Sequence, residues 1–233
     1  MCLKRITNMI IETMGKRRTP SYTKALFHFD SNLGDEVAGN NWFVNAGYDR
    51  PYLYISANSK FGAGFAWCSS SDRRNTFLEY SGLITNILDI TKDFTFDVWV
   101  KNSSNYLWLV AAYSTATISQ SPTIGFFITD NTIGIRYYIG GTLSTVTANY
   151  TDTYTWMHFA YVRSGTTNYI FINGILSFQN TTSVFDASNY LRVGQCFDGG
   201  ATTNQGYIDE LRISSVARWT SNFTPPTSAY TLD

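Results

Sequence analysis

Hydrophobic and polar residues alternate along most of this chain in short runs separated by turn-forming residues. The clearest run is Asp93–Lys101 (DFTFDVWVK), in which Phe94, Phe96, Val98 and Val100 occupy every second position. In an extended strand, side chains two residues apart point to the same face. The pattern therefore predicts a β-strand with one apolar face turned toward a core.

Similar runs continue through residues 24–233, and no convincing helical pattern interrupts them. Asp130-Asn131, Gly140-Gly141 and Asn173-Gly174 separate neighbouring runs, as expected for tight hairpin turns that need positive φ angles. The pattern predicts an all-β fold, a sandwich of two antiparallel sheets. The other predicted strands are Ala25–Asp30, Trp42–Val44, Pro51–Ser56, Gly64–Trp67, Thr76–Tyr80, Tyr106–Tyr113, Thr123–Asp130, Thr132–Gly140, Thr142–Asn149, Trp156–Arg163, Asn168–Ile172 and Tyr190–Gly194.

The stretch Gly206–Pro226 (GYIDELRISSVARWTSNFTPP) is predicted to form the last strand of the domain, followed by an aromatic segment that anchors the chain end. Strict alternation over Tyr207–Ser214 would put Asp209 on the same side as Leu211 and Ile213. One acid is therefore expected to point the same way as two core residues. A buried acid needs either a cation or hydrogen-bond donors as partners.

These motifs, in this order, resemble concanavalin A-like, laminin-G-like jelly-roll domains, whose closing strand commonly reads Gly-aromatic-Ile-Asp-Glu-Leu/Val-Arg-Ile. The appended ARWTSNFTPP is similar to the version of the domain found in bacteriophage virion and tail-associated proteins. Within it, Val216–Trp219 is expected to form one helical turn that Pro225 stops. The resemblance implies a jelly roll whose relatives include lectins, adhesins, hydrolases and structural modules. Other matching pieces are Ala25–Asp30, Lys60–Gly64, Asp93–Lys101, Trp156–Gly165 and Tyr169–Leu176.

The amino-acid composition limits the classes of partner that the chain is expected to bind. The 233 residues can bury one substantial core, and charged residues make up only 15% of the chain, which indicates a polar but uncharged surface. Seventeen basic and seventeen acidic residues leave no net charge, so no general attraction to nucleic acid is expected. No apolar run approaches the ~20 residues of a membrane span, so membrane insertion is not expected.

Residues 1–23 differ from the rest because they are basic and lack clean periodicity. We divide the chain into this N-terminal arm and a jelly-roll domain over residues 24–233. The arm is either a flexible leader, with Met14 as the true start, or a segment that docks on a partner protein. It contains no apolar core of a signal peptide. Its candidate partner-binding residues are Lys4, Arg5, Lys16, Arg17 and Arg18.

No catalytic residue is assigned. Glycosidases of the resembled fold use two glutamates on one face of a strand, within a Glu-x-Asp-x-x-Glu or Glu-x-Asp-x-Glu pattern, whereas this chain offers only Asp209-Glu210 and Asp93…Asp97. Adjacent acids are expected to face opposite sides of a strand, so Asp209 and Glu210 would not reach one glycosidic bond. His158 lies in a predicted strand and is expected to be a satisfied core residue.

The resemblance also implies a structural Ca²⁺, because many relatives bind calcium through a few acidic side chains and backbone carbonyls. Asp30, which ends the first predicted strand, and Asp209, on the last, match acids that relatives place close together. The alternative is that Asp209 simply accepts backbone N–H groups in a turn.

Glycan binding would need an aromatic platform beside polar groups. No convergent cluster can be identified from the sequence, so the ligand-binding residues stay unknown, and the candidates are Trp42, Trp67, Tyr106, Trp108, Tyr137 and Tyr138. The sequence therefore favours a non-enzymatic bacteriophage protein on the virion surface, a decoration or adhesion module whose arm, with the Trp219–Pro226 tail, attaches to capsid or tail proteins. The alternative is a lectin-like domain that binds host-surface glycans, and a glycoside hydrolase is the third. A homo-oligomer is compatible with either of the first two.

Overall fold

A computed structural model describes residues 21–37, 39–46, 52–54, 59–62, 64–68, 76–104, 107–115, 122–129, 131–151, 155–194 and 205–233. The candidate arm residues lie outside these ranges, so their proposed role stays a prediction; they are Lys4, Arg5, Lys16, Arg17 and Arg18.

The all-β prediction is confirmed: strands account for almost all regular structure in the described ranges, together with one short 3₁₀ turn, η2 (Ile84–Asn86). No helix in these ranges is long and apolar enough to cross a membrane. The strands are β1 (Thr23–Phe27), β2 (Trp42–Ala46), β3 (Tyr52–Tyr54), β4 (Gly64–Cys68), β5 (Thr76–Tyr80), β6 (Phe94–Ser104), β7 (Leu107–Tyr113), β8 (Ile124–Ile128), β9 (Thr132–Ile139), β10 (Thr142–Asn149), β11 (Met157–Ser164), β12 (Thr167–Ile172), β13 (Ile175–Thr181), β14 (Tyr190–Val193) and β15 (Gln205–Ser214).

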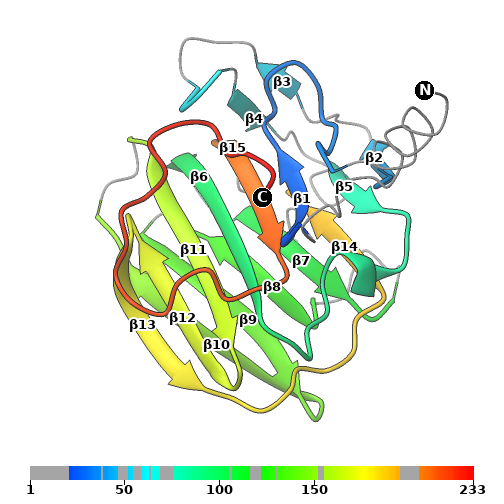
Figure 1. The fold of residues 1–233 in the computed structure, drawn as a ribbon, viewed down its shortest axis with the longest axis vertical. Coiled ribbons are helices and arrows are strands. Elements are labelled where there is room, and N and C mark those ends of the chain that lie inside the picture. The colour runs from blue at the N-terminus through cyan, green and yellow to red at the C-terminus, as the bar shows by residue number, and fades with distance from the viewer. Residues whose placement is uncertain are drawn as a thin grey trace, which may run out of the picture.

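The strands form two antiparallel sheets that pack face to face (Figure 1). Sheet A has eight strands, in the order β13-β12-β11-β6-β15-β4-β3, with β1 pairing with β15 beyond this path. Sheet B has seven strands, in the order β10-β9-β8-β7-β14-β5-β2. The closing strand β15 thus lies in the middle of sheet A, where it pairs with β6, β4 and β1.

The core lies between the sheets, and β6 contributes to it as the alternation predicts. Phe94, Phe96, Val98 and Val100 are at most 1% exposed and belong to one apolar cluster with side chains of sheet B such as Phe126. Burying a large apolar side chain of this kind stabilises a fold by about 1.5–3 kcal/mol. The intervening positions of β6 are left on the outer face of sheet A.

The closing strand departs from its expected alternation. Its pairing with β6 shifts register between Asp209 and Arg212, which is a β-bulge, and Glu210 inside the bulge has a φ of 53°. The extra residue reverses the pattern, so Leu211 and Ile213 pack in the inter-sheet core while Asp209 lies on the outer face. The expectation that Asp209 points the same way as these core residues is therefore wrong, because a bulge adds a residue that strict alternation does not include.

After β15 the chain crosses the outer face of sheet A as the C-terminal strap, residues 215–233, in front of β6, β11 and β12 in Figure 1. The predicted helical turn at Val216–Trp219 is wrong. The Val216 carbonyl accepts the Thr95 hydroxyl and the Arg218 N–H donates to the same Thr95 oxygen, so these backbone groups bond to β6 instead of to each other. Trp219 and Phe223 pack against apolar side chains on β11 and β12.

Candidate functional site

The bulge of β15 places a buried acid beside the 59–62 loop. Asp209 is 0% exposed, and its Oδ2 accepts backbone N–H groups of Lys60 at 2.9 Å and Phe61 at 2.8 Å. Its Oδ1 is buried without a hydrogen-bond partner in the described part of the chain. Burial, together with the charges of Glu210 and Asp30, raises the pKa of Asp209 to about 7, although the two N–H bonds oppose the shift.

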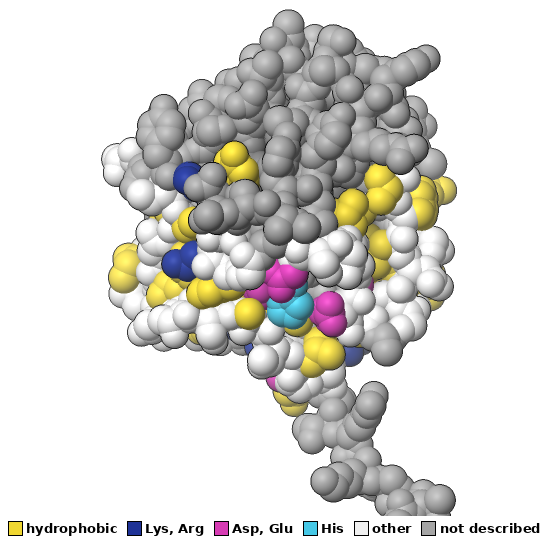
Figure 2. Space-filling view, turned by 90° about the horizontal axis from the view of Figure 1, so that it is seen from above, with side chains coloured by type: hydrophobic (Ala, Val, Ile, Leu, Met, Phe, Trp, Pro, Cys, Tyr) yellow, Lys and Arg dark blue, Asp and Glu magenta, His cyan; other side chains and the backbone are white. Residues whose placement is uncertain are grey.

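Glu210 occupies the neighbouring position and is also fully buried. His28 Nδ1 lies 2.8 and 2.9 Å from its two carboxylate oxygens, and the Tyr230 N–H donates to Oε2 at 2.7 Å. Burial raises the pKa of Glu210, although these donors oppose the shift. Because the bulge turns both carboxylates toward the outer face, the expectation that Asp209 and Glu210 face opposite sides is wrong. Figure 2 shows a histidine among acidic side chains on this end of the molecule.

Asp30 completes the acidic group. A Cβ built on Gly62 would lie 1.9 Å from Asp30 Oδ1, so this carboxylate lies directly against the loop that Asp209 binds. The structure thus brings Asp30 and Asp209 to the same loop, as the calcium hypothesis requires. No three His, Cys, Asp or Glu side chains in the described ranges are grouped closely enough to hold a metal ion. A cation at Asp30 and Asp209 would therefore need backbone oxygens as further ligands.

A second polar group lies buried under the C-terminal strap. Arg212 donates to both carboxylate oxygens of Asp97, at 3.0 and 2.8 Å, and His158 Nε2 lies 2.9 Å from the Tyr230 hydroxyl and 3.5 Å from Asp97 Oδ2. Burial opposes ionisation of Asp97, but the charge of Arg212 and hydrogen bonds from His158 and Arg212 outweigh it and hold its pKa at about 2. His158 is fully buried, as expected for a core or semi-core residue, but it is only partly satisfied, because its Nδ1 has no hydrogen-bond partner among the described residues. This group fastens the strap to β6, β11 and β15.

Three further side chains form a row across the outer face of sheet A. The row lies toward the C-terminal end of β6, past the buried polar group around Asp97. Tyr207 pairs directly with Lys101, and the pairing of Met157 with Val100 places Trp156 beside Lys101 on the other side. The ring centroids of Trp156 and Tyr207 are 6.4 Å apart, and Lys101 Nζ lies 6.0 Å from the Tyr207 centroid. All three side chains are half-buried. We call Trp156, Lys101 and Tyr207 the aromatic row.

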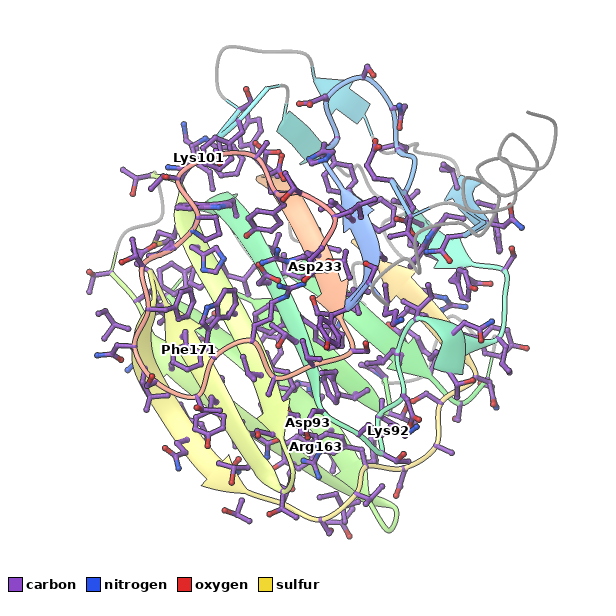
Figure 3. The ribbon with its side chains drawn as sticks, viewed as in Figure 1. Lys92, Asp93, Lys101, Arg163, Phe171 and Asp233 are labelled. Carbon is purple, nitrogen blue, oxygen red and sulfur yellow. The ribbon has the colours of Figure 1, made fainter. Side chains whose placement is uncertain are left out.

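The 59–62 loop extends this row with a second lysine and a second group of rings. Lys60 Nζ lies 4.0 Å from the Trp99 centroid and 5.4 Å from the Phe61 centroid. Phe61 and Trp156 both pack against the buried cluster that contains Trp99. We call the row together with Lys60 and Phe61 the aromatic face; Figure 3 labels Lys101 near the upper bend of the strap. Partly exposed aromatic rings beside ammonium donors suit the apolar faces and hydroxyl groups of sugars.

The sequence reasoning missed these residues. Of its six aromatic candidates, Trp108 and Tyr137 are 0% and 4% exposed and are not surface platforms. Trp42 and Tyr138 are partly buried. The side chains of Trp67 and Tyr106 lie outside the described residues. The signal that identifies the aromatic row is the register between β11, β6 and β15, which pairs positions more than 50 residues apart and cannot be read from local alternation.

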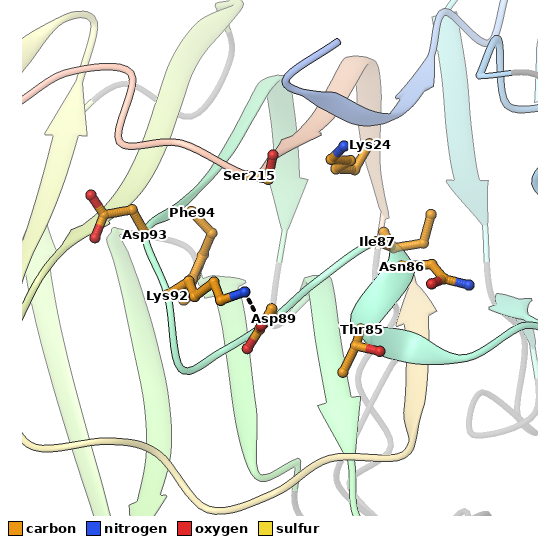
Figure 4. A pocket seen from close by; sticks show the side chains of 9 residues that line it. All are labelled: Lys24, Thr85, Asn86, Ile87, Asp89, Lys92, Asp93, Phe94 and Ser215. Atoms are coloured by element: carbon orange, nitrogen blue, oxygen red, sulfur yellow. Dashed lines mark ion pairs between the residues drawn. The ribbon is translucent and has the colours of Figure 1, made fainter. Parts of the chain in front are cut away.

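A pocket of about 270 Å³ lies near the other end of β6 (Figure 4). Its charged groups are already engaged, because Lys92 pairs with Asp89 at 3.3 Å and Asp93 accepts the Gly165 N–H at 2.7 Å. It also lacks an exposed ring on which a sugar could lie. The aromatic face is therefore the better candidate for a binding site. The pocket is lined by Lys24, Thr85, Asn86, Ile87, Asp89, Lys92, Asp93, Phe94 and Ser215.

Comparison with known families gives one match. The model of the concanavalin A-like lectin/glucanases superfamily (Laminin_G_3) matches residues 79–221, more than half of the chain. The match includes β6, β11 and β15, and with them the aromatic row and all of the buried polar group except Tyr230. It confirms the resemblance to concanavalin A-like, laminin-G-like domains that was drawn from the sequence. None of the curated proteins searched matches this chain.

Solved structures with a similar fold include binding domains of botulinum neurotoxins. The serotype G binding domain is 12% identical with a TM-score of 0.62, over 84% of this chain and 48% of that chain. A neurotoxin DC binding domain in complex with SialylT is 11% identical with a TM-score of 0.63, over 84% and 48%. The same type of domain in complex with rat synaptotagmin II is 11% identical with a TM-score of 0.64, again over 84% and 48%. This chain spans about half of each, and the likeness shows the fold alone.

Proposed function

We propose that this chain, which belongs to the concanavalin A-like lectin/glucanases superfamily, is a non-enzymatic binding module that holds a glycan on the aromatic face of sheet A. The observation that carries the proposal is the aromatic row, in which Lys101 on β6 and Tyr207 on β15 meet Trp156, the residue directly before β11. A platform on paired strands is rigid, so little entropy is lost when a ligand binds. SialylT, named with one neurotoxin domain of the same fold, is compatible with a ligand of this class.

A hydrolase is the weaker proposal. The neighbouring acids Asp209 and Glu210 are fully buried, and each already accepts backbone N–H groups. A catalytic carboxyl must come within hydrogen-bond reach of the bond that it cleaves. The 59–62 loop and Tyr230 lie against these two acids, so a substrate would have to displace both.

Binding on a glycan array tests the proposed function. We expect the protein to bind at least one class of glycan, and Trp156→Ala and Tyr207→Ala to lose most of that binding. Phe43→Ala is the matched control, because Phe43 is an aromatic residue 43% exposed on β2 of the other sheet. A blank array, or full binding by both row variants, would exclude this function for the aromatic face.

The calcium hypothesis also stays a proposal. We propose that Asp30 and Asp209 hold a structural Ca²⁺, whose positive charge would keep the Asp209 carboxylate ionised and order the 59–62 loop. The residues fit such an ion in two respects: Asp209 Oδ1 is a buried oxygen without a hydrogen-bond partner among the described residues, and Asp30 lies against the same loop. Because Asp209 binds the backbone of Lys60 and Phe61, ordering this loop would also order part of the aromatic face.

The biological setting that we propose is the surface of a bacteriophage particle, with residues 1–23 attached to capsid or tail proteins. The support is the resemblance of ARWTSNFTPP to phage virion proteins and the basic character of the arm. The strap residues Trp219 and Phe223 pack on sheet A, so they are less suited to be the anchor than the arm is. Binding of particles by the full chain but not by a variant lacking residues 1–20, which leaves β1 from Thr23 intact, would support this setting, and equal binding by both would exclude these residues as the anchor.

A further inference from the structure

The cations of the aromatic face differ from other cations of the described chain. Four basic residues elsewhere are neutralised by a carboxylate, and Lys24 and Arg163 donate side-chain hydrogen bonds. The ammonium groups of Lys60 and Lys101, in contrast, form neither an ion pair nor a hydrogen bond with any described residue. Both instead lie over aromatic rings. The neutralised pairs are Lys92–Asp89, Arg192–Glu79, Arg212–Asp97 and Arg218–Asp233.

The position of these two ammonium groups favours contact with a ligand. The face of an aromatic ring attracts a cation, but a ring is not a conventional hydrogen-bond acceptor. It therefore leaves most of the three N–H donors of a lysine ammonium group without a conventional acceptor. Lys60 lies 4.0 Å from the Trp99 centroid and Lys101 6.0 Å from the Tyr207 centroid. Both side chains are half-buried, so their charges are less screened by solvent than those of fully exposed lysines.

The acids nearest this face do not neutralise it. Asp209 and Glu210 are fully buried and bonded to backbone groups, and Asp30 lies against Gly62. Along β6, Lys101 pairs with Tyr207, whereas Asp209 pairs with Trp99, two positions nearer the bulge. Lys101 is therefore the cation further from the acidic group and the expected main contact for an anion.

We infer that the ligand of the aromatic face is an acidic saccharide, one whose carboxylate or sulfate group binds Lys101 and Lys60 while its ring lies on Trp156 and Tyr207. This inference rests on the proposed function and names its ligand class. Hydrogen bonds between charged partners contribute more than neutral ones, so they provide a preference for acidic over neutral sugars. A single-stranded nucleic acid also presents anions and flat rings, but the fold family and the absence of net charge favour the saccharide.

The experiment compares a neutral oligosaccharide with its carboxylated and sulfated counterparts by calorimetric titration of the full chain. We expect tighter binding of an acidic form, weakened by salt, and a loss of about tenfold or more in Lys101→Gln for the acidic form only. Lys92→Gln is the matched control, because Lys92 is a lysine near the other end of β6 and pairs with Asp89. The two acidic forms distinguish carboxylate from sulfate as the preferred group.

The possible results of this titration separate the preference for acidic saccharides from the proposed glycan-binding function. Equal affinity for neutral and acidic forms, or equal losses for both in Lys101→Gln, overturns the acidic preference and leaves the proposed function standing. No binding of any form overturns both. Tighter binding of a single-stranded oligonucleotide than of any saccharide also overturns both and identifies a nucleic-acid face. Loss of neutral and acidic binding alike in Trp156→Ala supports the platform independently of charge.

Discussion

The rings of Trp219 and Phe223 stack in parallel, with centroids 3.9 Å apart and planes 5° apart. This pair fixes the strap on sheet A, because both rings pack against apolar residues of β11 and β12 such as Phe171 (Figure 3). The strap also bonds to the turn between β12 and β13: the Phe223 N–H donates to the Gly174 carbonyl at 2.9 Å. The strap is thus part of the folded domain and covers apolar surface that would otherwise face water.

Gly174 offers a direct test of strap docking. A Cβ at this position would lie 2.0 Å from the Phe223 carbonyl oxygen, so Gly174→Ala must displace the strap. Gly141→Ala is the matched control, because Gly141 has nearly the same φ, 77° against 76°, occupies the same position of another hairpin turn and has nothing within 4 Å of its Cβ. We expect Gly141→Ala to cost about 1 kcal/mol from its backbone alone, and Gly174→Ala about 1–3 kcal/mol more. Urea unfolding of both variants measures the difference, and equal losses would contradict docking at Gly174.

The buried pair of Asp97 and Arg212 predicts a large stability effect. Arg212→Met leaves the Asp97 carboxylate buried without its cation, and breaking such a pair costs about 3–5 kcal/mol. Arg218→Met serves as the control, because its partner Asp233 is 36% exposed and the expected loss is below about 1 kcal/mol. The double variant Asp97→Leu/Arg212→Met should recover part of the loss, since no uncompensated charge remains. Equal unfolding free energies for the two single variants would contradict this account.

Local sequence patterns correctly predicted the features of the fold that depend on local backbone geometry. The apolar face of β6 follows from period two, and the turn at Asn173-Gly174 has positive φ angles of 50° and 76°, as the dipeptide requires. The bulge at Glu210 could not be predicted in this way, because glutamate has no local preference for a φ of 53° and the burial and hydrogen bonds that stabilise it come from distant segments.

The candidate site was predicted less well than the fold because it is built from long-range pairs. Asp30 and Asp209 were placed together on family resemblance, and the structure brings both to the 59–62 loop. The aromatic row instead requires the register of three strands, and a shift of one residue would turn Trp156 or Tyr207 to the other face. Residue type alone therefore could not separate these rings from the many core aromatics.

The raised pKa of Asp209 predicts a pH dependence of stability. The pKa is about 7 in the folded protein, above the ordinary value of 3.8, so between these values the folded state binds a proton that the unfolded state has lost. This contribution to stability is complete below pH 3.8 and is lost as the pH rises through about 7. Asp209→Asn keeps an oxygen acceptor and removes this titration. Urea unfolding between pH 4 and 8 should show that the natural protein loses stability relative to Asp209→Asn as the pH rises. Because both proteins contain Glu210 and His28, the comparison isolates the effect of Asp209. Parallel curves of unfolding free energy against pH would contradict the assignment.

Calcium should reverse the effect of burial on Asp209, because a bound cation stabilises the ionised carboxylate. We expect Ca²⁺ added to EDTA-treated protein at pH 7.5 to release heat and raise the melting temperature; at a hundredfold excess over the dissociation constant, a ligand adds ~2.7 kcal/mol to the free energy of unfolding. The response should weaken at pH 5.5, where protons compete for Asp209. Asp30→Asn and Asp209→Asn should abolish it, whereas Asp93→Asn, at the start of β6 and away from the 59–62 loop, should retain it. Absence of both heat and a melting shift in the natural protein would exclude the site, and a response that survives in both Asp30→Asn and Asp209→Asn would place calcium elsewhere.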